Sequence, residues 1–190
     1  MSETQIHDKV EAMPFPDSGR AKCYEKRAVD SFLSRARDVF ESDDVGTLRS
    51  SDVRAAAFPL VRGGYSVTAV DAALGRVEDA FAALEREHAL SRLGARAWVA
   101  ETRDTAQVVL DRLRRPRGSR FERVNILRYG YRVDEVDVVA ERVARYLAAG
   151  DPVTPDQVRA VAFRMQRGGY REAQVDAVLD AVVDVMLAVG

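Results

Sequence analysis

A chain of 190 residues that is 47% hydrophobic and 31% charged can bury a core, and it is typical neither of disorder nor of a membrane-embedded protein. The net charge of −1 argues against a general nucleic-acid or anionic-lipid binder, because such proteins usually carry a positive field over a whole domain. One cysteine excludes an internal disulfide framework, and the N-terminal sequence lacks the pattern of a secretory signal, so a cytoplasmic location is expected.

Four similar segments, which we call modules one to four, are predicted along the chain. Residues 1–14 are expected to form a flexible N-terminal arm, followed by modules one and two in residues 15–92. Residues 93–119 are predicted to be a connecting helix and a basic linker, and residues 120–190 hold modules three and four. Each module is predicted as a short helix, a glycine turn and a long helix. The expected fold class is therefore all-α, with these repeats packed as a helical bundle.

The repeat is clearest between modules two and four, whose residues match at a constant offset without a gap. Each carries an Arg-Gly-Gly-Tyr string followed by Val-Asp, and modules three and one carry weaker versions of it. The motif residues are Arg62, Gly63, Gly64, Tyr65, Val70 and Asp71 in module two, Arg128, Gly130, Tyr131, Val136 and Asp137 in module three, and Arg167, Gly168, Gly169, Tyr170, Val175 and Asp176 in module four. Module one is the most eroded, with Tyr24 followed by Val29 and Asp30.

Apolar residues recur at helical spacing after each motif. In module two, Val70, Leu74, Val77 and Phe81 are separated by four, three and four positions, which predicts a heptad-like seam. Module one has a similar seam from Val29 to Val39. We expect module one to pair with module two, and three with four, inside one chain, with the long helices parallel; the oligomeric state is left open.

The recurring tyrosines and aspartates favour structural roles. A tyrosine after a glycine turn is expected to pack its ring beneath the turn, while its hydroxyl finds a partner. An aspartate in the first turn of a helix interacts favourably with the helix dipole and is expected to pair with the motif arginine. No catalytic, cofactor-binding or metal site is predicted, because His7 and His88 lack a neighbouring acid that suggests a relay. We therefore expect no enzyme and no cofactor. If Gly64 or Gly169 adopts positive φ, a β-branched residue in its place should be badly tolerated.

An arginine cluster is the one feature that suggests a partner surface for phosphate or acidic protein. A solvated connector is the preferred alternative, because Asp111 and Glu122 dilute the charge. The cluster consists of Arg112, Arg114, Arg115, Arg117, Arg120 and Arg123.

The string of Phe58, Arg62 to Tyr65 and Val70-Asp71 resembles the N-terminal signature of DivIVA cell-division and cell-pole proteins, and repeated versions resemble an actinobacterial group of DivIVA-domain proteins. The resemblance implies a cytoplasmic, non-enzymatic scaffold at septa or poles, with division or cell-wall proteins as partners. In that family, membrane contact is attributed to an exposed Phe-Arg pair just before Gly-Tyr. The matching positions are Arg62-Gly63 and Arg167-Gly168, so weak or no membrane binding is expected.

A nucleic-acid-associated regulator is the alternative hypothesis. It would use the helix, turn and helix units as an irregular helix-turn-helix, and the segment from Arg112 to Arg123 would contact the phosphates of the nucleic acid. The low net charge makes this alternative the less favoured one.

Overall fold

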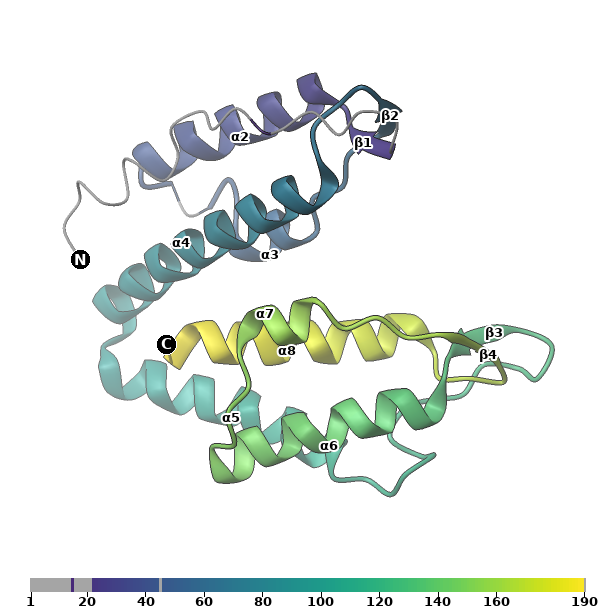
Figure 1. The fold of residues 1–190 in the computed structure, drawn as a ribbon. Helices are drawn as coiled ribbons and strands as arrows, with labels where there is room; N and C mark the ends of the chain where they lie inside the picture. The colour runs from purple at the N-terminus through teal and green to yellow at the C-terminus, as the bar shows by residue number, and fades with distance from the viewer. Residues whose placement is uncertain (1–14, 16–21, 45, 190) are drawn as a thin grey trace. The chain divides into compact units, whose positions relative to one another are not determined.

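The computed structural model describes residue 15 and residues 22–44 and 46–189. It divides the chain into two compact units, Met1–Ser91 and Arg92–Gly190, which we call the first and second units. The described part of the chain is mostly helical, with seven helices and two small two-stranded sheets (Figure 1). The N-terminal arm expected at residues 1–14 lies outside the described residues.

In the first unit a two-stranded sheet stands where two long helices begin (Figure 1). The strands pair antiparallel, with Cys23 opposite Val61. Both long helices lead away from the sheet in the same direction, so they run parallel. The elements are β1 (Lys22–Tyr24), α2 (Lys26–Glu41), α3 (Ser50–Arg54), β2 (Leu60–Arg62) and α4 (Val67–Leu93).

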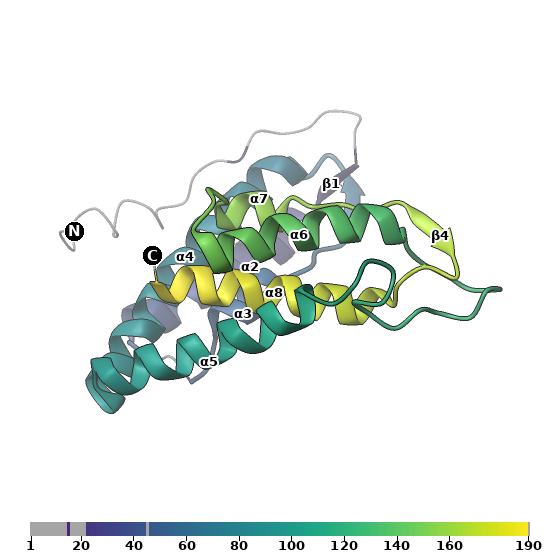
Figure 2. The same ribbon diagram turned by 90° about the horizontal axis from the view of Figure 1, so that it is seen from below.

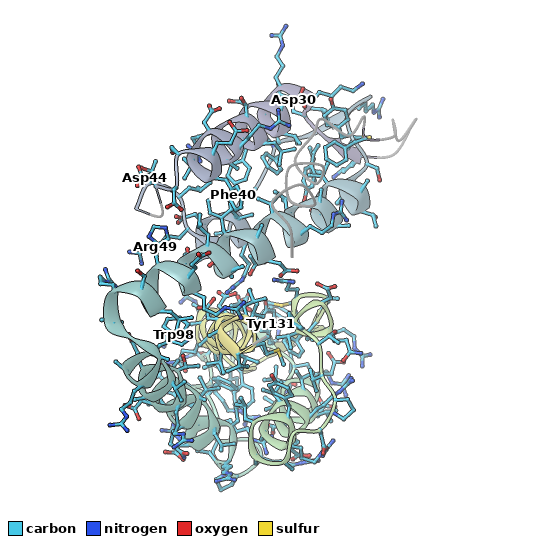
Figure 3. All side chains as sticks on the ribbon, turned by 90° about the vertical axis from the view of Figure 1, so that its left-hand side faces the viewer. Asp30, Phe40, Asp44, Arg49, Trp98 and Tyr131 are labelled. Carbon is cyan, nitrogen blue, oxygen red and sulfur yellow. The ribbon has the colours of Figure 1, made fainter. Side chains whose placement is uncertain are left out.

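The core of the first unit lies between these parallel helices. Apolar residues spaced by three and four positions face one another, because that spacing places them on one side of a helix. The rings of Phe40 and Phe81 meet edge to face with centroids 5.7 Å apart, and Figure 3 shows Phe40 reaching in from α2. The buried residues are Val29, Ala36 and Val39 from α2, Val70, Leu74 and Phe81 from α4, Val53 from α3, and Leu48, which precedes α3.

One charged residue interrupts the apolar seam of α4. Glu78 is buried, and its carboxylate accepts a hydrogen bond of 2.7 Å from Nε of Arg54 at the end of α3. A buried charge is tolerated when it is paired in this way, and the pair ties the short helix to the long one. Sequence periodicity alone did not predict it.

The second unit adds one more helix to the same order of elements. Helix α5 packs against both α6 and α8, and α7 packs against α8 (Figure 2). Residues 93–119 are therefore not only a connector, since Val109, Leu110 and Leu113 of α5 are buried. The elements are α5 (Ala95–Leu113), β3 (Tyr129–Tyr131), α6 (Val133–Ala149), α7 (Pro155–Arg159), β4 (Met165–Arg167) and α8 (Glu172–Val189).

The short helices span five residues each, and strands follow them. Helix α3 ends at Arg54, although alanines and an apolar residue continue the sequence to Phe58. Pro59 disfavours helical backbone at Phe58, whose ring packs instead on Tyr24 with centroids 5.3 Å apart. The segment between short and long helix thus contains a strand, β2 or β4, as well as a turn.

The two glycines of each Gly-Gly pair have different roles. Positive φ occurs at Gly63 (+73°) and Gly168 (+63°), the first glycine of each pair, not at Gly64 and Gly169. The second glycine is needed for a close approach instead. A Cβ on Gly64 would lie 2.0 Å from the carbonyl oxygen of Tyr24, and one on Gly169 would lie 2.4 Å from that of Tyr131.

We predict that Gly64→Ala destabilises the first unit by about 3 kcal/mol, because the added methyl group meets backbone that cannot move aside without breaking the strand pair. The matched variant Gly63→Ala has open space around its Cβ, so it should cost only the positive φ, about 1 kcal/mol. Urea denaturation followed by circular dichroism measures both. A larger loss for Gly63→Ala would show that backbone conformation matters more than the close approach.

Candidate functional site

The predicted motif residues meet at the strand end of each unit. Arg62 and Arg167 are the last residues of β2 and β4, and the glycines lead from them to the tyrosines. The valines of the motif, Val70, Val136 and Val175, are buried in the cores. They anchor the first turns of the long helices, so the aspartate after each valine is held at the same end of the unit as the tyrosines.

Two tyrosines join the segments of each unit through their backbones. In the first unit Tyr24 N–H donates to the carbonyl of Tyr65 at 2.9 Å, and Tyr65 N–H donates back at 3.0 Å. Tyr131 and Tyr170 form the same reciprocal pair in the second unit, with both bonds at 2.9 Å. The close approach at the second glycine permits this pairing.

The tyrosine hydroxyls then cross to the aspartate of the opposite segment. Tyr65 Oη lies 3.5 Å from Asp30 Oδ2. In the second unit Tyr170 donates to Asp137 Oδ1 at 3.1 Å, and Tyr131 Oη lies 3.5 Å from Asp176 Oδ2. The fourth pair is Tyr24 with Asp71. Burial raises the pKa of the Tyr24 hydroxyl, and so do the charge of Asp71 and the hydrogen bond between the two side chains.

This crosswise arrangement changes the expected role of the aspartates. They were expected in the first turn of each long helix, where the helix dipole acts, and as partners of the motif arginine. The first turns of the four long helices do not include them, and the side-chain partner common to all four is a tyrosine. Asp137 alone also meets an arginine within the described residues, and that arginine is Arg120 rather than Arg128 of the motif. The sequence signal for the pairing was present, since tyrosine and aspartate recur together.

Arg120 is the centre of a buried polar network in the second unit. Its guanidinium donates to the Asp137 backbone carbonyl at 2.8 Å and lies 3.1 Å from that residue's carboxylate. Asp137 also accepts the N–H of Gly118 at 2.7 Å, and Arg120 N–H donates to Tyr170 Oη at 3.3 Å. The charges are thus paired inside the protein, which offsets much of the cost of burying them. The loop after α5 is fixed to α6 and to the segment between β4 and α8 as a result.

The arginine cluster does not form one surface. Arg120 is buried, and Arg117 is engaged by a bidentate pair with Glu141, both N···O distances being 2.6 Å. Arg112 is half-buried, while Arg114, Arg115 and Arg123 are exposed. Two of the six arginines therefore serve the fold, and the predicted phosphate surface is smaller than the sequence pattern indicated.

Each unit has a phenylalanine against one motif tyrosine, which the sequence analysis missed. The rings of Phe121 and Tyr170 meet edge to face with centroids 5.3 Å apart. The rings of Phe15 and Tyr65 lie 5.1 Å apart in the first unit. In both cases the phenylalanine precedes the first strand of its unit. This shared position in the sequence could have indicated the contact with the tyrosine.

A loop with exposed apolar side chains leads into β3. Ile126 is 75% exposed, Leu127 is 80% exposed and Tyr129 is 55% exposed. The neighbouring Arg123 and Arg128 are exposed as well. We call residues 123–129 the apolar–basic loop. Neither the Arg62-Gly63 and Arg167-Gly168 positions nor the arginine cluster predicted the exposed pair of Ile126 and Leu127.

Among the described residues there is no group of three or more histidine, cysteine, aspartate or glutamate side chains that could hold a metal ion. None of the described helices is both long enough and apolar enough to span a membrane.

The fold and these two ends define a mostly helical protein of two units, each closed by a pair of tyrosines. Comparisons with protein-family models, with curated proteins and with solved structures find no match to this chain.

We predict that Tyr170→Phe destabilises the second unit by about 1–2 kcal/mol, because it leaves the buried Asp137 carboxylate short of a donor. Tyr131→Phe is the matched control, since its hydroxyl lies farther from its aspartate in an exposed pair, and it should cost less. Thermal denaturation of the two variants provides the test. Equal losses would contradict a special role for the buried pair.

Acid should weaken the second unit through Glu141. Hydrogen bonds from Arg117 and Arg120 lower the pKa of its carboxyl from the ordinary 4.5 to about 2. A carboxylate with a lowered folded-state pKa adds stability above its unfolded pKa, and this stability is lost as pH falls toward the folded value. Between about pH 4.5 and pH 2 the wild type should therefore lose more stability than Glu141→Gln.

The control for this measurement is Glu101→Gln, which removes an exposed carboxylate of α5 and should keep the wild-type response. Urea denaturation at a series of pH values compares the three proteins. If Glu141→Gln and the wild type showed the same pH dependence, the arginine contacts would not matter for stability.

Proposed function

We propose that the chain is a non-enzymatic scaffold or adaptor of the DivIVA type, built from four copies of one helical module. In this proposal it acts in the cytoplasm at division septa or cell poles and recruits other proteins, including division or cell-wall machinery. The motif of Tyr65 and Asp71 and its counterparts supports the proposal, because the residues that suggest the family also close each unit. They serve to join helices and are not arranged around a reacting group.

The apolar–basic loop is the observation that carries the proposal. Ile126 and Leu127 are large apolar side chains that lie side by side in the sequence, and the loop holds them in solvent. Adjacent exposed apolar residues flanked by arginines are typical of a contact surface. Met165 on β4, opposite Tyr131, is also exposed and extends the apolar character toward the sheet.

This loop fits weak docking on an anionic membrane. Full burial of two such side chains contributes about 1.5–3 kcal/mol each. Each arginine near an anionic surface adds about 1 kcal/mol. A gain of this size, less the cost of association, corresponds to reversible binding. Weak or no membrane binding was expected because Arg62-Gly63 and Arg167-Gly168 lack the aromatic residue of the family's tip. We propose weak binding through Ile126 and Leu127 instead.

In this proposal, partner proteins dock on the helices. The outer faces of α5 and α6 each carry an exposed valine, Val108 at 71% and Val138 at 59%. Both lie on long helices whose other faces are buried in the core, so these faces point away from it. Helical protein–protein contact of this kind leaves the apolar–basic loop available for lipid.

We predict that wild-type protein co-sediments weakly with vesicles containing phosphatidylglycerol, and that Ile126→Ser/Leu127→Ser abolishes this. Val108→Ser/Val138→Ser is the matched control, because it removes two exposed apolar side chains elsewhere and should bind as wild type. Vesicle binding that survives the loop change would contradict the proposed lipid contact.

The same variants decide the cellular part of the proposal. A fluorescent fusion of the wild type should form septal or polar foci in dividing cells, and the loop variant should form fewer of them. Staining of the nucleoid would instead support the alternative, a nucleic-acid-associated regulator, whose binding to duplex DNA would fall steeply with salt.

A further inference from the structure

The sheet of the first unit places two positive charges directly opposite each other. Lys22 on β1 is the cross-strand partner of Arg62 on β2, and both side chains are exposed. Like charges in such a position repel, because cross-strand Cβ atoms lie only about 5 Å apart. Within the described part of the chain neither residue forms an ion pair with a carboxylate.

The second unit avoids this repulsion at the equivalent place. There Tyr129 stands opposite Arg167, and the guanidinium carbon lies 5.6 Å from the centre of the tyrosine ring. An arginine over an aromatic face is a favourable contact. The same pair of strands can therefore be built without opposing charges, so the pair of Lys22 and Arg62 is not required by the fold.

The start of α2 adds further positive charge at this end (Figure 1). Lys26 and Arg27 occupy its first turn, which holds no acidic residue, although a helix N-terminus favours acids there. Helix α6 follows the usual preference, with Asp134 and Glu135 in its first turn. The acids nearest in sequence are Glu25, which precedes α2, and Asp30, which meets the Tyr65 hydroxyl.

We propose that this basic end, formed by Lys22, Arg62 and Arg27, is a docking site for an acidic segment of a partner protein. Carboxylates of such a segment would lie between Lys22 and Arg62 and offset the repulsion that the folded chain leaves in place. Residues that lower local stability, such as like charges placed opposite each other, without a compensating contact in the fold are expected at functional sites. The proposal goes beyond the scaffold function, since it names a second surface and the chemistry of its partner.

The composition of the basic end favours an acidic protein over other polyanions. Stable membrane docking needs apolar insertion together with charge, and Leu60 is the large exposed apolar residue in this sheet, whereas the second unit offers Ile126, Leu127 and Tyr129. Nucleic-acid binders usually neutralise more phosphates than three cations can reach. Carboxylates suit the site, because arginine binds them with two parallel hydrogen bonds.

The test measures binding of fluorescein-labelled poly-L-glutamate to the full chain by fluorescence anisotropy. The wild type should bind at low salt and weaken as salt rises. Lys22→Gln/Arg62→Gln should bind about tenfold more weakly. The same variant should melt at or above the wild-type temperature, because it removes the repulsion; a merely structural role would lower the melting temperature.

The matched control is Arg96→Gln/Arg103→Gln, which removes two exposed charges from α5 and should keep wild-type affinity. An equal loss in this control would show a general charge effect and overturn the site. The proposal would also be wrong if the Lys22/Arg62 variant bound poly-L-glutamate as tightly as the wild type. A wild type that preferred a DNA oligonucleotide or phosphatidylglycerol vesicles to the peptide, and a variant that had lost this preference, would likewise contradict an acidic protein partner. The loop variant Ile126→Ser/Leu127→Ser should still bind the peptide, so failure of the lipid proposal and failure of this one can be told apart.

Discussion

The reciprocal backbone pair between two tyrosines is the constraint on which each unit depends. It requires a glycine next to the second tyrosine, because any side chain on Gly64 or Gly169 would collide with the opposing carbonyl. Since a long helix begins shortly after each tyrosine, the pair brings the two helix starts together. The helices then run parallel, and their apolar seams meet along their length.

Both units bury charge next to this frame, but they do so differently. The first unit pairs Arg54 with Glu78 between the short and long helices. The second unit places Arg120 among Asp137, Glu141 and the Tyr170 hydroxyl, so that a loop carries the cation. In the first unit the paired charge ties α3 to α4, and in the second unit it ties a loop to α6. Removal of one partner is costly, because the other charge would stay buried and unpaired.

The same frame presents two ends of different chemistry. The end of the second unit carries Ile126 and Leu127 in a loop, and its arginine Arg167 lies against an aromatic ring. The end of the first unit carries Lys22 opposite Arg62 and a basic first turn of α2. Because these surface residues are exposed and the same tyrosine pair closes each unit, they can differ between the units without affecting the cores. A scaffold with two kinds of contact surface is the consequence we infer.

The sequence alone determined the local features of this protein. Helical class and the seams of Val29 and Val70 follow from periodicity, which depends only on near neighbours in the chain. The tertiary structure decided the rest, because the strands β1 to β4 are too short to show a pattern and form only when distant segments meet. It also decided that Arg120 is inside and Leu127 outside, since burial depends on whether partners such as Asp137 and Tyr170 arrive from elsewhere in the chain.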